Sequence, residues 1–356
     1  MKGTTSLLDS ALSPLRAGGE PVHRGVIKRS PDDFQVTEIA ATSPDGEGAH
    51  LWLDIRRTDM NTAFAARTLA RVAGVRERDV GYAGLKDRHA RARQWFSIPA
   101  PPDDAALCDA LQASGLDALA MVRHGRKLRR GALSGNQFTI RVELPDGPVT
   151  DLEARLERMR REGVPNYFGP QRFGHAGGNL ERARAMLCDG VRVRDRHRRG
   201  LYLSAMRSAL FNRVLAARVA AGSWNRLLPG EAVSLAGSSS YFLADEPVDD
   251  LQQRLSVFDV HPSGPLWGRG GTPARAQARA VEQEALVGQE KLMSAIETAR
   301  VDASRRALRL KVEALSARSE DGACVLSFEL TAGAYATVVL RELFQIDDAS
   351  GSASVN

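Results

Sequence analysis

The sequence predicts a mixed fold of helices and strands in which one discontinuous domain carries an insertion. The chain has 356 residues, more than one domain usually contains, so we expect two domains. Strand and helix patterns alternate in the N-terminal part and return near the C-terminus, whereas the stretch after residue 163 is rich in Gly, Pro and aromatic residues. With 43% hydrophobic and 26% charged residues, the composition is that of a globular protein and excludes general disorder.

The N-terminal part shows two periodicities. Strand patterns, in which apolar and polar residues alternate, lie at 34–39, 51–55, 94–98 and 137–144. Helical patterns lie at 61–73, 103–114 and 151–162. In the first helix Phe64, Ala65, Leu69 and Val72 share one face, and Gly74 stands at the C-cap position.

The middle and the end of the chain predict further elements. Helices are expected at 179–188, 204–221 and 277–297. Near the C-terminus Val325 to Leu330 reads as a strand, and Ala334 to Phe344 as a helix behind Gly333. Strand-and-helix segments at both ends with a different middle therefore indicate a discontinuous domain.

Arginine dominates the basic residues, with 43 Arg against 6 Lys and a net charge of +6. The guanidinium fork can bind phosphate at two points, but a GC-rich genome also replaces Lys by Arg without any function. One window departs from such a background, because Arg155 to Arg207 holds 13 Arg, no Lys and 5 acids. This window is either a solvated surface or a phosphate-binding stripe.

Several classes of protein are excluded. Cys108, Cys188 and Cys324 are far apart and show neither disulfide nor zinc spacing, so no metal site is expected. The N-terminus lacks the apolar core of a signal peptide, and no apolar run approaches the roughly 18 residues of a membrane span. We expect a soluble, cytoplasmic protein that is a monomer and has neither a membrane nor DNA as partner.

The segment Gly81 to Trp95 is the densest functional candidate. A short strand runs into a turn that delivers Lys86, Asp87, Arg88 and His89 together. Nearby cations favour the ionised form of a carboxylate, which suits nucleophilic or electrostatic work. An ordinary surface turn would also accommodate these residue types, and the residues alone favour that interpretation.

A family resemblance changes this balance. It is carried by the strings Tyr82-Ala-Gly-Leu-Lys-Asp-Arg-His-Ala90, Val164-Pro-Asn-Tyr-Phe-Gly-Pro-Gln-Arg-Phe-Gly174 and Ala332-Gly-Ala-Tyr-Ala-Thr-Val-Val-Leu-Arg-Glu-Leu343. Three shorter strings agree as well: Asp32-Asp-Phe-Gln-Val-Thr-Glu38, Gly135-Asn-Gln-Phe138 and Val193-Arg-Asp-Arg-His197. In these motifs, which extend in order from about Lys28 to Leu343, the chain resembles the TruD family of tRNA pseudouridine synthases.

The resemblance implies an activity and a site. Members of the family isomerise uridine 13 of tRNA to pseudouridine, which requires the base to be flipped out and needs no cofactor. The family's nucleophilic aspartate falls on Asp87, which could attack either the sugar or the pyrimidine ring. The positions expected to contact substrate are Phe34, Phe138, Asn136, Tyr335, Lys28 and Lys86, and either lysine could orient Asp87.

The resemblance also implies an α+β architecture. A pseudouridine synthase catalytic domain with a central, mostly antiparallel sheet is expected at 1–161 and 309–356, and an inserted α/β domain, the TRUD domain, at 162–308. Two departures concern the pocket: Ala92 stands where the family often carries Thr, and Tyr335 where Phe is common. Tyr keeps the stacking face but adds a hydroxyl that needs a partner.

Two other functions compete with this interpretation. A non-catalytic tRNA-binding protein or RNA chaperone of the same fold would keep the arginine stripe and lose the chemistry, which the intact Lys86-Asp87 pair argues against. A glycosidase acting on nucleosides or sugars would need two facing carboxylates, and Glu38 is the attractive second candidate.

Overall fold

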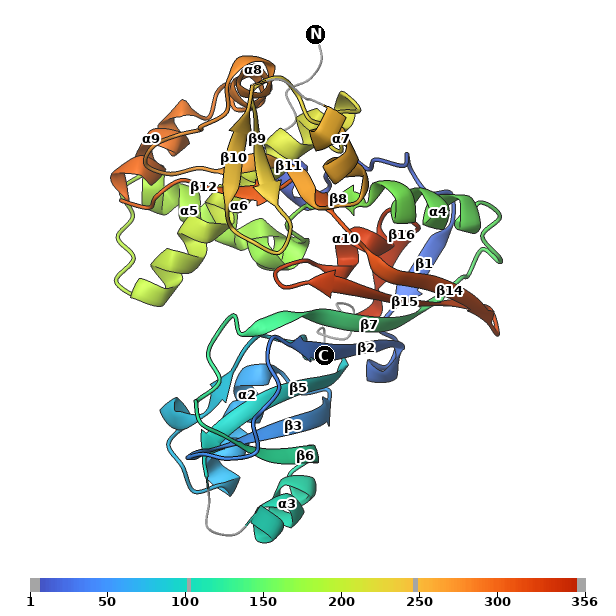
Figure 1. Cartoon of the computed structure of the whole chain (residues 1–356), viewed down its shortest axis with the longest axis vertical. Helices are drawn as coiled ribbons and strands as arrows, with labels where there is room; N and C mark the ends of the chain where they lie inside the picture. The colour runs from blue at the N-terminus through green and yellow to red at the C-terminus, as the bar shows by residue number, and fades with distance from the viewer. Residues whose placement is uncertain (1–6, 101–103, 246–248, 351–356) are drawn as a thin grey trace. The chain divides into compact units, whose positions relative to one another are not determined.

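The computed structural model describes residues 7–100, 104–245 and 249–350, and its chain forms two compact units. The first, here called the sheet unit, comprises Val22–Leu156, Val312–Gly333 and Phe344–Asn356, and the second, the helix-rich unit, comprises Met1–Pro21, Glu157–Lys311 and Ala334–Leu343 (Figure 1). Both units are therefore discontinuous. The domain limits expected from the sequence, 161/162 and 308/309, stay a prediction.

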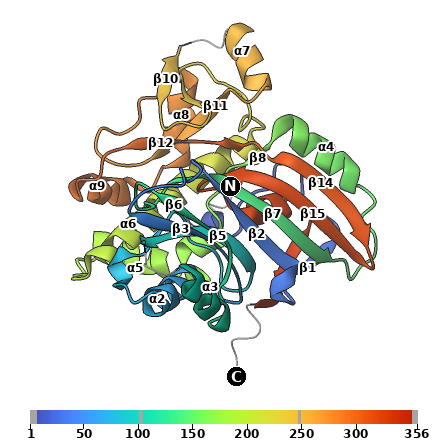
Figure 2. The same cartoon turned by 60° about the horizontal axis from the view of Figure 1, so that its bottom comes forward.

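The sheet unit is built around one 10-stranded sheet, whose main path in the described residues runs β14-β15-β7-β2-β5-β3-β6 (Figure 2). Its strand pairs are antiparallel except β2 with β5 and β1 with β16, which are parallel. This confirms the predicted α+β class with a mostly antiparallel sheet. The strands are β1 (Arg24–Ile27), β2 (Phe34–Ala40), β3 (His50–Thr58), β4 (Gly81–Tyr82), β5 (Arg91–Pro99), β6 (Asp117–His124), β7 (Leu133–Glu143), β14 (Glu313–Glu320), β15 (Ala323–Thr331) and β16 (Gln345–Asp348).

Register decides which side chains share a face of this sheet. Phe138 lies opposite Val36 on β2 and Phe328 on β15, and Asn136 lies opposite Glu38. Directly paired residues point to the same face, and residues two apart on one strand do so too. One face of the sheet therefore carries Phe34 and Glu38 from β2 together with Asn136 and Phe138 from β7.

Helices α2 (Thr62–Val72) and α3 (Asp104–Ala113) pack on β3, β5 and β6. Asn61 caps α2 by accepting a hydrogen bond from the Phe64 backbone N–H at 2.8 Å, and Gly74 adopts φ +66° beyond its end, as the sequence predicts. Ala65 and Leu69 are buried in the core, but Phe64 is exposed. The prediction that Phe64 shares the buried face was wrong, because the buried stripe is centred on Ala65 and Leu69.

The helix-rich unit combines packed helices with a 4-stranded sheet of order β10-β9-β11-β12. Its strands are β8 (Val164–Pro165), β9 (Glu231–Leu235), β10 (Tyr241–Ala244), β11 (Val260–Leu266), β12 (Ser304–Ala307) and β13 (Arg309–Leu310). Its helices are α1 (Leu7–Leu12), α5 (Gly178–Cys188), α6 (Arg196–Ala220), α7 (Asp249–Ser256), α8 (Ala276–Ala285), α9 (Glu290–Thr298) and α10 (Ala336–Leu340), and α4 (Leu152–Glu162) crosses the boundary between the units. Buried residues of α5, α6 and α9 form one core cluster.

Two helices of this unit differ from the sequence prediction. The expected helix 277–297 is two helices, because Gly288 adopts φ +81° between α8 and α9. Helix α6 begins at Arg196 rather than at Ser204, since the Asp195 side chain caps it by accepting from the Arg198 backbone N–H at 2.9 Å. Arg196, Arg198 and Arg199 of the arginine-rich window therefore belong to the first turn of α6.

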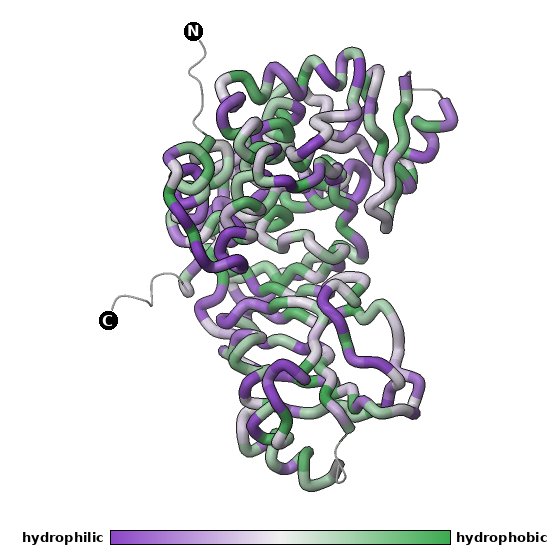
Figure 3. The backbone as a smooth tube through the Cα atoms, turned by 90° about the vertical axis from the view of Figure 1, so that its left-hand side faces the viewer, coloured by the Kyte–Doolittle hydropathy of each residue, from purple (hydrophilic) through white to green (hydrophobic). Residues whose placement is uncertain are grey.

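Hydrophilic and hydrophobic stretches are interleaved along the backbone (Figure 3). Among the described residues, no helix combines the length and the apolar character that crossing a membrane requires.

Candidate active site

The segment between β4 and β5 presents Asp87. Gly81 and Tyr82 pair with Ser97 and Phe96 of β5. The Ala83 carbonyl accepts a hydrogen bond from the Gly131 N–H at 2.9 Å, and the Ala90 carbonyl accepts one from Asp59 N–H at 3.2 Å. These bonds hold both ends of the turn 83–90, here called the Asp87 turn. The Asp87 side chain is 45% exposed, so its carboxylate is accessible.

Lys28 is the cation that pairs with Asp87. Its Nζ donates to Asp87 Oδ2 at 3.3 Å, although the two residues are 59 positions apart. The Lys28 side chain is only 8% exposed, and its ammonium lies 4.7 Å from the centre of the Phe34 ring. Lys28 has φ +58°, a backbone conformation that is uncommon for a residue with a side chain. This strained position at the end of β1 supports a functional reason for the geometry.

A second carboxylate, which the sequence did not indicate, shares the Lys28 ammonium. Asp348 Oδ2 lies 3.4 Å from Lys28 Nζ. Asp348 ends β16, which pairs with β1 in parallel so that Asp348 lies opposite Ile27, the residue before Lys28. Its only sequence signal is the short run Phe344-Gln-Ile-Asp-Asp348, which is too brief to predict a strand pairing over 300 residues.

Phe34 and Phe138 are neighbours on the same face of the sheet. Their ring centres are 6.0 Å apart with the edge of one ring toward the face of the other, and Phe138 also stacks on Phe328 at 5.4 Å. Both predicted aromatic residues are buried in this structure. One face of the Phe34 ring forms a cation–π interaction with the Lys28 ammonium.

Asn136 carries an unsatisfied group. Its side-chain Oδ1 is buried and has no hydrogen-bond partner among the described residues. An unpaired buried acceptor costs free energy, about 1–3 kcal/mol, and such groups are rare in folded proteins. Because Asn136 follows Gly135 and precedes Phe138 by two residues on β7, its amide belongs to the same face as the aromatic pair.

Lys86 does not contact Asp87 but forms a buried ion pair. Its Nζ donates to Glu38 Oε2 at 2.6 Å, and the side chains are 3% and 1% exposed. Burial lowers the pKa of the Lys86 ammonium, and the charge and hydrogen bond of Glu38 oppose that effect. The predicted alternative that Lys86 orients Asp87 by pairing with it therefore does not hold, since Lys28 makes that contact.

The residues around this ion pair hold the middle of the Asp87 turn in place. The Lys86 backbone N–H donates to Thr62 Oγ1 at 2.8 Å, and that hydroxyl donates to Gln94 Oε1 at 3.0 Å. Arg57 donates to the same hydroxyl at 2.9 Å, and burial lowers the pKa of Arg57 to about 10. Glu38 is thus the anion that balances two buried cations.

Tyr335, the remaining predicted site residue, belongs to the helix-rich unit. It stands at the N-cap of α10, and its ring packs edge-to-face against Phe168 at 6.3 Å. The Arg306 guanidinium lies 4.2 Å from the centre of the same Phe168 ring. The other six predicted residues belong to the sheet unit.

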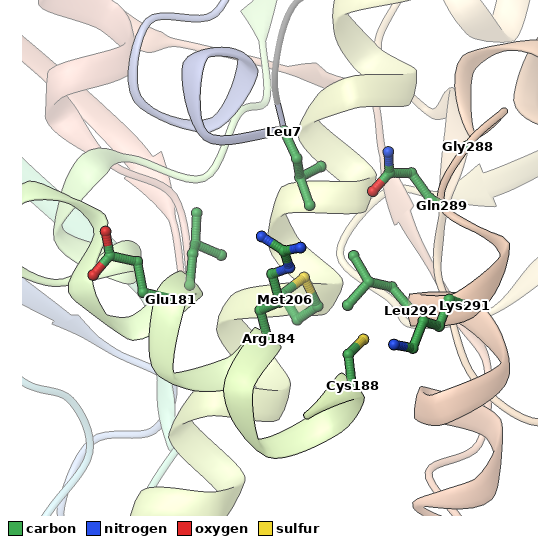
Figure 4. Close-up of a pocket in the computed structure, with 10 residues that line it drawn as sticks. Leu7, Glu181, Arg184, Cys188, Met206, Gly288, Gln289, Lys291 and Leu292 are labelled. Carbon is green, nitrogen blue, oxygen red and sulfur yellow. The ribbon is translucent and has the colours of Figure 1, made fainter. Parts of the chain in front are cut away.

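A cavity of about 530 Å³ in the helix-rich unit contains none of these residues. Leu180 of α5, Met206 of α6 and Leu292 of α9 line it. The charged residues Arg184 and Lys291 also contribute to the lining, together with Cys188 (Figure 4). In the described part of the chain, no group of His, Cys, Asp and Glu could hold a metal ion.

Comparison with known proteins identifies the family. The family model for tRNA pseudouridine synthase D (TruD) matches residues 17–183 and 179–343. The tRNA pseudouridine synthase D of Methylococcus capsulatus is 49% identical over 337 residues, covering 93% of this chain and 94% of that protein. That of Nitrosococcus oceani is 44% identical and covers 94% of each chain.

A solved structure agrees on the fold. The crystal structure of a Methanosarcina mazei protein assigned as tRNA pseudouridine synthase D superimposes with a TM-score of 0.76 at 22% identity, covering 95% of this chain and 97% of that one. At that identity the likeness concerns the fold alone. The family model and the curated relatives go further, and this chain belongs to the TruD family of tRNA pseudouridine synthases.

Proposed function

We propose that this protein converts uridine 13 of tRNA to pseudouridine, with Asp87 as the nucleophile acting on a uridine that is flipped out of its helix. The observation that carries the proposal is the accessible Asp87 carboxylate, which Lys28 holds at 3.3 Å. It occurs in a chain whose curated relatives are named tRNA pseudouridine synthase D.

The reaction balances without a co-reactant. The glycosidic N1–C1′ bond breaks, a C5–C1′ bond forms, C5 loses its proton and N1 gains one, so every change stays within one nucleotide. A carboxylate can assist by forming a transient covalent bond either to the sugar or to the pyrimidine ring. Asp87 therefore suffices as nucleophile, and Lys28 orients it.

The predicted substrate-binding residues match the uracil that such a reaction handles. The Asn136 amide offers a donor and an unused acceptor, which complement the alternating carbonyl and N–H edge of uracil. We propose that Asn136 binds this edge and that Phe34 and Phe138 form the apolar floor beside it. Tyr335, which belongs to the helix-rich unit, stays a predicted substrate-binding residue. Stacking of a base on an aromatic ring contributes about 1–3 kcal/mol, which helps to offset unstacking in the RNA.

The geometry of Glu38 argues against a nucleoside or sugar glycosidase. That class uses a second, facing carboxylate as general acid or base. Glu38 is almost fully buried and bound by Lys86 at 2.6 Å. It therefore has a structural role and is not accessible as a general acid or base.

Tritium release tests the reaction. A tRNA transcript labelled with tritium at C5 of uridine should lose label in the presence of the protein, and modification-specific sequencing should map the product to position 13. Asp87→Asn should abolish release while tRNA binding persists. Asp109→Asn, at an exposed carboxylate of α3, is the matched control and should retain activity.

The other outcomes are equally informative. An active Asp87→Asn variant would refute the nucleophile, and product at a different uridine would refute the position. Tight tRNA binding by an inactive wild-type protein would favour the non-catalytic tRNA-binding or chaperone function.

A further inference from the structure

The loop between β6 and β7 concentrates positive charge beside the Asp87 turn. This loop, Gly125 to Gly131 (the basic loop), holds Arg126, Lys127, Arg129 and Arg130 and no acidic residue. Arg126, Arg129 and Arg130 are exposed. Within the residues that the structure describes, none of these four cations forms a salt bridge, and the nearby Asp79 is already bound by Arg76 at 2.6 Å. Among the described residues, no carboxylate therefore lies within salt-bridge distance of these four cations.

The backbone of the basic loop is held firmly in place. Trp52 Nε1 donates to the Arg126 carbonyl at 2.8 Å, and the Leu128 N–H donates to Ser97 Oγ at 2.9 Å. The Leu128 side chain is buried in a cluster with Trp52 and Ala83. These contacts attach the loop to β3 and β5, so its cations are presented from a rigid support.

The basic loop also contacts the segment that leads to Asp87. The Arg130 guanidinium lies 3.8 Å from the centre of the Tyr82 ring and donates to its hydroxyl oxygen. Lys127 Nζ donates to the Arg78 carbonyl at 2.5 Å. The approach is so close that a Cβ at Gly81 would lie 2.4 Å from the Leu128 carbonyl oxygen, which only glycine avoids.

A hollow of about 740 Å³ lies where these segments meet. Arg78, Lys127, Arg129 and Arg130 contribute positive charge to its lining, Glu77 contributes a carboxylate, and Tyr82 contributes an aromatic ring. Three net positive charges in an open hollow favour an extended polyanion over an enclosed small molecule, because such a molecule would need apolar walls around most of its surface.

We propose that the basic loop is a binding site for the phosphate backbone of the RNA substrate, next to the nucleotide that Asp87 acts on. The inference rests on the proposed function for the identity of the RNA, and it adds a site outside the predicted arginine window. Arg126 and Arg129 contact phosphates, whereas Arg130 and Lys127 link the loop to the segment before Asp87.

The salt dependence of tRNA binding tests this site. Each phosphate contact contributes roughly 0.7–0.9 to the slope of log K against log salt concentration. The double variant Arg126→Gln/Arg129→Gln should lower that slope by about 1–2 and weaken binding about tenfold at 0.1 M KCl. Arg67→Gln/Arg71→Gln, which removes two exposed cations from α2, is the matched control and should leave the slope near that of the wild type.

The outcomes separate this inference from the proposed function. A slope for Arg126→Gln/Arg129→Gln equal to that of the α2 control would overturn the inference, even if the wild type forms pseudouridine. A reduced slope supports it even if the wild type proves inactive. Calorimetric titration with inorganic phosphate distinguishes a small-anion site, because saturable phosphate binding combined with an unchanged RNA slope would also overturn the proposal.

Discussion

Replacing Glu38 by glutamine should destabilise the protein by about 3–5 kcal/mol, the usual cost of breaking a buried ion pair. Glu38 Oε2 lies 2.6 Å from Lys86 Nζ, which corresponds to an attraction of roughly 6 kcal/mol at an effective dielectric constant of 20. The negative charge of Glu38 also raises the pKa of Arg57, which burial lowers. Glutamine keeps an acceptor for Lys86 but leaves both cations without a counter-charge.

The loss of stability in Glu38→Gln has an upper limit, because the Lys86 ammonium can release its proton. At pH 7 the Lys86 ammonium, whose ordinary pKa is 10.5, can give up its proton at a cost of about 5 kcal/mol, since each pKa unit corresponds to 1.36 kcal/mol. Glu38→Gln should be more destabilising than Lys86→Met, because Lys86→Met leaves Glu38 still facing Arg57. The double variant Glu38→Leu/Lys86→Met should recover the part of the loss that comes from the unpaired Lys86, whereas Arg57 still lacks its counter-charge.

Urea unfolding followed by tryptophan fluorescence measures these differences, with Trp52 and Trp95 as reporters in the same unit. Asp117→Asn, which breaks the exposed pair with Arg56 at 2.9 Å, is the control and should change stability by less than about 1 kcal/mol. A Glu38→Gln protein as stable as the control would refute the reasoning. Full activity in the folded double variant would assign Lys86 to the fold, whereas selective loss of substrate binding would support the predicted contact of Lys86 with substrate.

Two further predictions concern titration and the shared lysine. Burial next to Arg309 lowers the pKa of His261 to about 4 from 6.5, and its Nδ1 accepts from Arg309 Nε at 3.5 Å, which requires the neutral ring. As the pH falls, the unfolded chain binds this proton before the folded protein does. The contribution of neutral His261 to the free energy of unfolding should therefore be fully present above pH 6.5 and fall by up to about 3 kcal/mol toward pH 4. In urea titrations His261→Asn should reduce this dependence of stability on pH, and an unchanged dependence would contradict the prediction. Asp348→Ala should lower kcat about tenfold with little change in KM, because Lys28 loses one of its two carboxylates. Asp348→Glu should restore most of the rate and Asp347→Ala should have no effect, whereas equal losses at both positions would indicate a merely structural role.

Local signals in the sequence predicted most elements of the sheet unit. Alternation of Phe138, Ile140 and Val142 identified β7, and Asn61 with Gly74 delimited α2. Prediction was poorer where a capping residue and the apolar periodicity indicated different helix starts. The apolar periodicity predicts that α6 starts at Ser204, although Asp195 is a strong N-cap residue nine positions earlier. An arginine-rich helix start has no apolar face, so periodicity alone could not reveal it.

The site depended on long-range pairing that local patterns do not carry. The family resemblance predicts Asp87 and either lysine as its partner, and the observation that Lys28 rather than Lys86 contacts Asp87 follows from the sheet. Lys86 precedes Asp87 directly, and adjacent residues on an irregular turn point in different directions. Lys28 meets Asp87 only because β1 joins the same sheet, where it pairs with β7 and with β16.

The scarcity of lysine in this chain bears on why lysine stands at these two positions. A guanidinium is planar and prefers to engage one carboxylate with two parallel hydrogen bonds, whereas an ammonium is a compact charge that can serve several acceptors around it. Lys28 Nζ lies at nearly equal distances, 3.3 and 3.4 Å, from Asp87 and Asp348, and it faces the Phe34 ring. Arginine would favour two parallel hydrogen bonds to one carboxylate and would occupy both oxygens of Asp87, the proposed nucleophile. In a chain with 43 Arg and 6 Lys, the residue at this position is therefore the one whose geometry leaves an oxygen of Asp87 available for the proposed reaction.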